Sequence, residues 1–64
     1  MVKNLLTQIL KKRLAKKYSQ DYVASRLKIS QSSYNKIENG TTQLTVAMLL
    51  QISVILDLEY LTTK

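Results

Sequence analysis

The sequence contains no cysteine and no histidine, and these two absences exclude several kinds of chemistry. Without cysteine the chain can form neither a disulfide nor a thiolate metal site, and without histidine it lacks the other common zinc ligand. The same absences remove the usual general bases and nucleophile pairs of enzymes. The acids are few and scattered: Asp21, Glu38, Asp57 and Glu59. We therefore expect a binding protein that has no catalytic residue, no metal and no cofactor.

The sequence also lacks proline, has a single glycine, and shows almost no sustained alternation of polar and apolar residues. Proline and glycine interrupt regular structure, and alternation is the pattern of half-buried strands. Their scarcity predicts an all-α protein, a compact bundle of four to five short helices joined by short connections. The 64 residues suffice for one domain, which we expect to span residues 1–64.

Acidic residues are few relative to basic ones. The sequence has ten lysines and arginines and four acids, which give a formal charge of +6. Six of the ten bases lie between residues 3 and 17. Such a charge favours a polyanionic partner, with nucleic acid first, an anionic membrane surface second, and plain solubility as a third explanation. Long apolar runs are also missing, since polar residues interrupt the stretch 44–61 well short of about 20 clean residues. No secretory signal is visible either, so we expect a cytoplasmic protein.

Four helices are predicted from the spacing of apolar residues and from capping residues. The first covers about residues 3–17 and is amphipathic and basic, with an apolar stripe of Leu6, Ile9, Leu10 and Leu14. Ser19, Ser30 and Thr45 are the expected N-caps of the other three. These helices are expected over 20–27, over 31–38 with an end at Asn39 and Gly40, and over about 46–56. The tail has room for about one further turn.

Two of the predicted helices, 20–27 and 31–38, are separated by only Lys28, Ile29 and the capping residue. So short a connection prevents a long antiparallel hairpin and makes the helices cross steeply, as in a helix-turn-helix. We place this unit at about residues 20–39. Its inner angle would be closed by Val23, Leu27, Ile29, Tyr34 and Ile37.

Three strings, "SQDYVASRL", "ISQSSYNKIENG" and "TVAMLLQI", together resemble the lambda repressor and Cro helix-turn-helix proteins. The resemblance covers residues 19–56, and Arg13 stands at its characteristic distance before Ser19. It implies that the third helix enters the DNA major groove while the second lies across the DNA backbone. It also implies a cytoplasmic protein encoded by a bacterium or a phage.

The predicted third helix has an outer face of small neutral polar residues. With Tyr34 and Ile37 pointing inward, a helical wheel places Ser32 outermost, with Asn35 and Lys36 beside it. Glutamine and asparagine can bond adenine through two hydrogen bonds, serine adapts to several base edges, and lysine donates to guanine. In the resembled family, bases are commonly read from the positions matching these residues. We therefore expect base readers at Gln31, Ser32, Asn35 and Lys36; for Gln31 the alternative is an exposed polar residue.

Contacts with the DNA backbone are expected at the start of the second helix and after the third. The N-terminus of a helix favours a phosphate, and the resemblance implies that Gln20 binds the backbone and braces Gln31. The full set expected to hold the backbone is Gln20, Ser33, Asn39, Gly40, Thr41, Thr42 and Gln43. Many relatives carry Lys or Arg in this loop and this chain carries none, so an ordinary polar connection is the alternative for residues 41–43.

Other positions matched by the resemblance have structural roles. Arg13 and Glu38 are expected to form an ion pair between the first and third helices. Lys28 occupies a turn position where relatives often have glycine, and a left-handed backbone there costs other residues about 1 kcal/mol. Tyr34 stands where a branched aliphatic residue is usual. We expect its ring in the core and its hydroxyl at the rim, with stacking on DNA as the alternative.

The C-terminal region has more apolar side chains than a core of this size is expected to absorb. We expect a dimer surface made of Val54, Ile55, Leu58, Tyr60 and Leu61, the alternative being that all of them pack internally. The predicted function is that of a sequence-specific regulator of transcription, most simply a repressor that binds double-stranded DNA as a homodimer. The rivals are an antitoxin or adaptor module that binds a protein partner, such as a toxin or another regulator, and a non-specific binder of polyanions or membrane surfaces.

Overall fold

The computed structural model describes the backbone of residues 2–58 and the side chains of residues 5–58, and this part of the chain forms four helices and no strand. Helix α1 spans Val2–Ala15, α2 spans Gln20–Leu27, α3 spans Gln31–Glu38 and α4 spans Val46–Leu56. The predicted all-α class with a helix-turn-helix is confirmed. The further turn predicted for the tail lies beyond residue 58 and outside the described residues.

The helices α2, α3 and α4 begin at the predicted capping residues. The hydroxyl of Ser19 accepts a hydrogen bond from the backbone N–H of Tyr22, that of Ser30 from Ser33, and that of Thr45 from Met48. Each cap satisfies one of the backbone N–H groups that a first helical turn leaves without a partner. Because capping depends on residues only three positions apart, the sequence predicts these three starts correctly.

Each of the four helices is followed within two residues by a residue whose backbone is left-handed. These residues are Lys17 (φ 61°), Lys28 (φ 63°), Gly40 (φ 82°) and Asp57 (φ 58°). After each, the next N–H bonds a carbonyl five residues back, as in the 3.0 Å bond from Ile29 to Ala24 and the 2.9 Å bond from Thr41 to Lys36. The turn at Lys17 ends α1 at Ala15, two residues before the predicted end. A Cβ atom at Gly40 would lie 3.3 Å from Leu6 Cδ1, so space as well as φ favours glycine there.

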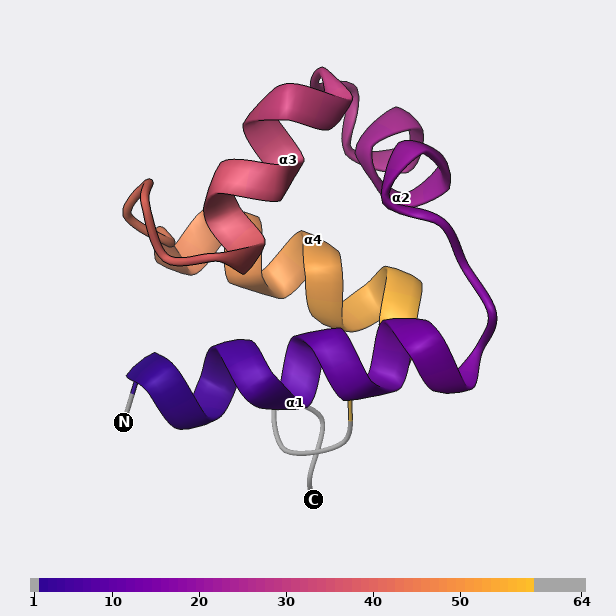
Figure 1. Cartoon of the computed structure of the whole chain (residues 1–64), viewed down its shortest axis with the longest axis horizontal. Helices are drawn as coiled ribbons and strands as arrows, with labels where there is room; N and C mark the ends of the chain where they lie inside the picture. The colour runs from indigo at the N-terminus through magenta and orange to yellow at the C-terminus, as the bar shows by residue number, and fades with distance from the viewer. Residues whose placement is uncertain (1, 59–64) are drawn as a thin grey trace.

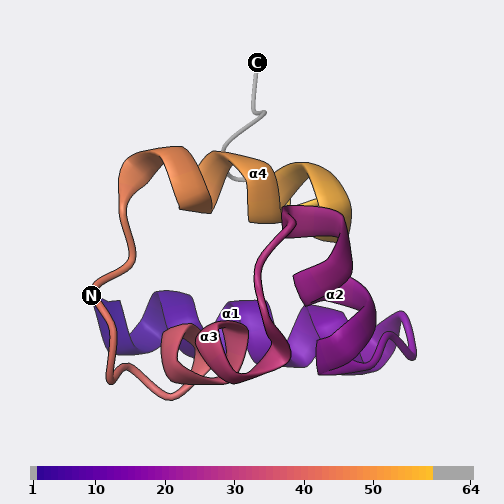
Figure 2. The ribbon, with the colours of Figure 1, turned by 90° about the horizontal axis from the view of Figure 1, so that it is seen from above.

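The helices are arranged so that α3 and α4 lie on different sides of the molecule. α1 and α4 run along the long axis, with α3 above them in Figure 1, and α2 and α3 cross steeply in the view of Figure 2. α3 packs against α1 and α2, and α4 packs against the same two helices. Within residues 2–58, the backbones of α3 and α4 do not approach closely, so the outer face of α3 stays free.

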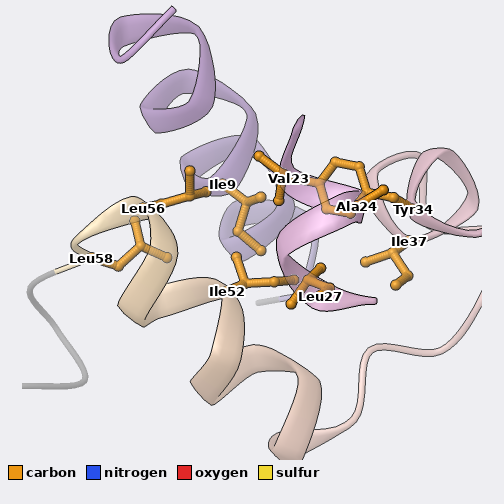
Figure 3. Close-up of a cluster of buried hydrophobic side chains, with 9 residues drawn as sticks. All are labelled: Ile9, Val23, Ala24, Leu27, Tyr34, Ile37, Ile52, Leu56 and Leu58. Carbon is orange, nitrogen blue, oxygen red and sulfur yellow. The ribbon is translucent and has the colours of Figure 1, made fainter. Parts of the chain in front are cut away.

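All four helices contribute to one hydrophobic core (Figure 3). Its buried members are Ile9, Val23, Ala24, Leu27, Tyr34, Ile37, Ile52, Leu56 and Leu58. Four of the five residues predicted to close the helix-turn-helix angle are buried, and Ile29 packs against the core as a half-buried residue. The helix-turn-helix is thus held from behind by α1 and α4.

The predicted apolar stripe of α1 is wrong in its second half. Leu10 is 39% exposed and Leu14 is 57% exposed, whereas Ile9 and Arg13 are buried. Apolar and basic residues are interspersed in the second half of this helix, so spacing alone did not settle its orientation. The inward face is set by Arg13, one turn after Ile9, because its guanidinium is bound in the protein interior. Among the described residues, no helix is long and apolar enough to cross a membrane.

Candidate nucleic-acid interface

The outer face of α3 holds all four residues predicted to read bases. Gln31, Ser32, Asn35 and Lys36 are exposed, whereas Tyr34 and Ile37 on the opposite face are 0% and 5% exposed. The helical wheel therefore placed both faces correctly. An exposed helix face with three neutral side chains that donate and accept hydrogen bonds, and one cation, matches the groups that line the edges of bases.

Behind this face, one carboxylate joins α1, α2 and α3. Arg13 donates from Nε to Glu38 Oε2 at 2.6 Å and from Nη2 to Oε1 at 3.1 Å. Gln20 Nε2 donates to Oε1 at 3.0 Å, and the Tyr34 hydroxyl donates to Oε2 at 2.7 Å. The third nitrogen of Arg13, Nη1, donates to the backbone carbonyl of Tyr18 at 2.9 Å. The bonds from Arg13 and Gln20 to Glu38 fix the position of α3 relative to the two helices that support it, and the bond from Tyr34 lies within α3.

Burial and hydrogen bonding shift the pKa values of this cluster. The hydrogen bond to Glu38 raises the pKa of Arg13. Burial acts to raise the pKa of Glu38, but the hydrogen bonds from Arg13, Gln20 and Tyr34 together outweigh it, so the pKa of this carboxyl is lowered. Burial, followed by the bond to Glu38, raises the pKa of Tyr34 well above its ordinary range. All three shifts favour a charged ion pair with a neutral tyrosine beside it.

The expected position of the Tyr34 hydroxyl is wrong. The side chain is 0% exposed, and its hydroxyl bonds Glu38 in the interior instead of lying at the rim. A ring that has no exposed surface cannot stack on DNA, so the alternative for Tyr34 is excluded as well. The signal that sequence reasoning missed is the spacing, because residues four apart on a helix are neighbours on one face.

The expected partner of Gln20 is also wrong. Gln20 Nε2 bonds Glu38, and its Oε1 accepts a hydrogen bond from Asn35 Nδ2 at 3.4 Å. Within residues 5–58, Gln20 makes no hydrogen bond to Gln31. Gln31 lies in the first turn of α3, whereas Asn35 and Glu38 lie along the side of α3 that faces α2. The carboxylate of Glu38 therefore draws the Gln20 amide away from the N-terminus of α3.

The segment after α3 is ordered by Asn39. Asn39 Oδ1 accepts hydrogen bonds from the backbone N–H of Thr41 at 3.0 Å and from its hydroxyl at 2.6 Å. The N–H groups of Thr41 and Thr42 also bond the carbonyl of Lys36. Gly40, Thr41, Thr42 and Gln43 are exposed, and so is Ser33, whose hydroxyl accepts a bond from Ser30 at 3.0 Å. The predicted backbone-contact residues thus lie around the C-terminal end and the flank of α3, except Gln20 at the start of α2.

The remaining described cations are free of ion pairs. In the part of the chain that the structure describes, the one ion pair joins Arg13 and Glu38. Arg26 donates a hydrogen bond to the Tyr22 hydroxyl at 2.9 Å, and the other described bases are lysines: Lys11, Lys12, Lys16, Lys17, Lys28 and Lys36. These positive charges are therefore available for an anionic partner.

The structure places the residues of the predicted dimer surface differently from one another. Leu58 is 5% exposed and packs in the core, so it does not fit that surface; the left-handed turn at Asp57 folds the chain back onto the bundle. Ile55 is half-buried against the core, and Val54 is 77% exposed. Tyr60 and Leu61 lie outside the described residues. Sequence reasoning missed Val46 and Leu50, which are 74% and 50% exposed and precede Val54 at four-residue spacing.

The fold and this face define the class of the protein, a helix-turn-helix domain with an exposed polar third helix. A family model described as helix-turn-helix matches residues 9–61, and the chain belongs to this family, of the lambda repressor and Cro type. The family consists of DNA-binding regulators. Neither the curated proteins nor the solved structures gave a significant match.

Proposed function

We propose that the protein is a sequence-specific repressor of transcription that binds a pseudo-palindromic operator as a homodimer, with α3 in the major groove. The observation that carries this proposal is the division of α3 into two faces. Its exposed face presents Gln31, Ser32, Asn35 and Lys36, and its buried face is fixed by Tyr34 and Ile37. A face held rigidly from behind suits readout of base edges, which depends on hydrogen-bond geometry.

The contacts with DNA divide by chemistry. Gln31 and Asn35 are suited to adenine, Lys36 to guanine, and Ser32 to several base edges. Phosphates would be held by Gln20 and Ser33, by the segment Asn39–Gln43, and by the lysines at the end of α1. Phosphate contacts position the protein, and base contacts specify the sequence.

A second copy is needed because one helix spans only a few base pairs, whereas two copies about one helical turn apart read a longer site. The exposed row on α4, formed by Val46, Leu50 and Val54, is the surface we assign to this contact. α4 contains no charged residue, so two protomers of charge +6 meet there with the least repulsion. Val46 also borders an apolar hollow of about 230 Å³ that is lined by Leu5, Leu6 and Leu49 among others, which extends this apolar surface towards α1.

Selection of bound sites from random double-stranded DNA tests the proposal. We expect a palindrome whose half-sites are centred about 34 Å apart. Binding to the selected site and to a scrambled one is then measured over a range of salt concentrations. A specific regulator keeps a large ratio between its affinities for the selected and the scrambled site as the salt concentration rises. A non-specific polyanion binder loses affinity for both sites equally steeply.

Substitutions separate base contacts from phosphate contacts. Gln31→Ala is expected to relax base preference, whereas Gln8→Ala, at an exposed position of α1, is the matched control and should leave it unchanged. Lys16→Gln and Lys17→Gln should weaken binding to all sequences about equally. If no sequence is preferred, the proposal fails, and the second candidate gains: a module that binds a protein partner, which the uncharged row on α4 favours.

A further inference from the structure

Three side-chain amides form a row that starts at the buried ion pair and ends in the segment after α3. Gln20 Nε2 donates to Glu38 Oε1 at 3.0 Å, Asn35 Nδ2 donates to Gln20 Oε1 at 3.4 Å, and Asn39 Nδ2 donates to Asn35 Oδ1 at 3.3 Å. Asn39 Oδ1 then accepts the two bonds from Thr41. The row therefore connects a buried carboxylate to an exposed residue on the outer face of α3.

The charge of Glu38 sets the direction of every bond in this row. A carboxylate only accepts hydrogen bonds, so Gln20 must turn its NH₂ group towards Glu38 and its oxygen towards Asn35. Asn35 must then offer its NH₂ group to Gln20, which leaves its oxygen to accept from Asn39. Arg13 and Tyr34 also donate to Glu38. Glu38 is therefore the acceptor in all of these contacts, as it is in the bond from Gln20.

Asn35 keeps hydrogen-bonding capacity for a partner outside the protein. An amide nitrogen has two hydrogens and an amide oxygen has two lone pairs, and the row uses one of each. The remaining donor and acceptor lie in a fixed order, with the donor on the side of Gln20 and the acceptor on the side of Asn39. Adenine presents an acceptor and a donor next to each other in the major groove, so a fixed order matches adenine in one orientation. An amide that is free to turn over would match more than one base edge.

We propose that Gln20 is a positioning residue that transmits the charge of Glu38 to Asn35 and thereby selects the base edge that Asn35 reads. This inference rests on the proposed function, since it assigns Asn35 to a base. It differs from a role in stability, because holding α3 in place requires only the bonds to Glu38 and not the two bonds that continue to Asn35 and Asn39.

The main test is Gln20→Met, which nearly keeps the length of the side chain and removes its amide. Arg13 and Tyr34 still donate to Glu38, so we expect the variant to fold, which circular dichroism checks. On selected DNA, base preference should fall about fivefold or more at one base pair of each half-site, the pair contacted by Asn35. Preference at the base pair that depends on Gln31 should stay unchanged. An equal loss of affinity on all sequences would show only a lost backbone contact and would overturn the inference.

Two further variants isolate the row. In an Asn35→Ala background, Gln20→Met should change no base preference, because the residue through which it acts is gone. Asn39→Ala, an exposed substitution at the other end of the row, should relax preference at the same base pair as Gln20→Met. Independent effects of the Gln20 and Asn35 changes would contradict the inference.

A measurement without DNA keeps this inference separate from the proposed function. In nuclear magnetic resonance spectra of the free protein, Gln20→Met should move the side-chain NH₂ signals of Asn35 and Asn39 towards the positions of an unbonded asparagine, while a Gln8→Met control leaves them in place. Unmoved signals would overturn the row itself. If the wild type selects no site, the proposed function and the base-reading role fail together, and the signals still decide whether the row exists.

Discussion

At the scale of single residues, Glu38 is the position on which the most interactions converge. Its side chain is 6% exposed and accepts hydrogen bonds from Arg13, Gln20 and Tyr34. The resemblance implied the pairing with Arg13, and the structure contains that ion pair. Tyr34 lies one turn before Glu38 on the same helix, so its bond is local. The bond from Gln20 depends on how α2 and α3 cross, which no local pattern describes.

Breaking the pair from one side is expected to be costly. Arg13→Met or Glu38→Gln should each lower the free energy of unfolding by about 3 kcal/mol or more, because the remaining charged or polar groups stay buried without their partner. The double variant should lose less than the sum of the two single losses. Urea unfolding of all four proteins measures the coupling, and a coupling near zero would contradict this structural role.

The lowered pKa of Glu38 predicts how stability depends on pH. Between the folded pKa and the ordinary value of 4.5, the unfolded chain binds more protons than the folded one, so acid favours unfolding there. The contribution of Glu38 is therefore fully present above about pH 4.5 and is lost as the pH falls through the folded pKa. In urea unfolding from pH 7 to pH 2, Glu38→Gln should show a weaker decline than the wild type. Parallel declines would refute this assignment.

At the scale of helices, the start of an element was easier to predict than its end or its inward face. Ser19, Ser30 and Thr45 cap their helices through contacts three residues away, so the information is local. The four helix ends all need a left-handed residue, and the chain supplies its single glycine to only one of them. Lys17, Lys28 and Asp57 accept this conformation because tertiary packing holds the turns in place, at a cost of about 1 kcal/mol each.

Glycine at these helix ends is expected to stabilise the fold. Lys28→Gly and Lys17→Gly should each raise the free energy of unfolding by up to about 1 kcal/mol, because glycine adopts a positive φ without the steric cost. Lys11→Gly is the matched control: Lys11 lies exposed within α1, where the same change should cost roughly 0.5 to 1 kcal/mol. Urea or thermal unfolding measures all three variants. If the free energy of unfolding changed in the same direction at the helix ends and within α1, this explanation would be ruled out.

At the scale of the whole molecule, basic and uncharged surfaces are separated. The described cations belong to α1, α2, α3 and the turns between them, whereas α4 carries none and exposes Val46, Leu50 and Val54. The proposed DNA-reading face on α3 and the proposed dimer surface on α4 therefore lie on helices whose backbones do not approach closely. A protomer can use both surfaces at once.

The proposed dimer surface is tested by placing charge on it. We expect the wild type to sediment as a dimer at high micromolar concentration, and Leu50→Lys or Val54→Lys to shift it to a monomer because two like charges would face each other across the contact. Leu14→Lys, an equally drastic change at an exposed leucine of α1, should leave the dimer intact. A wild-type monomer at high concentration, both free and on DNA, would defeat the dimer.

The sequence by itself determined the helical class, the three capped helix starts and the outer face of α3, because these follow from residue spacing within one or two turns. The resemblance added the pairing of Arg13 with Glu38. Only the tertiary structure decided which face of α1 is buried, how deeply the Tyr34 side chain is buried, that Gln20 faces Asn35, and that Leu58 belongs to the core. The physical reason is the same in each case. These contacts join residues of different helices or reverse the chain after one, so they depend on how the helices pack and not on the local order of residues.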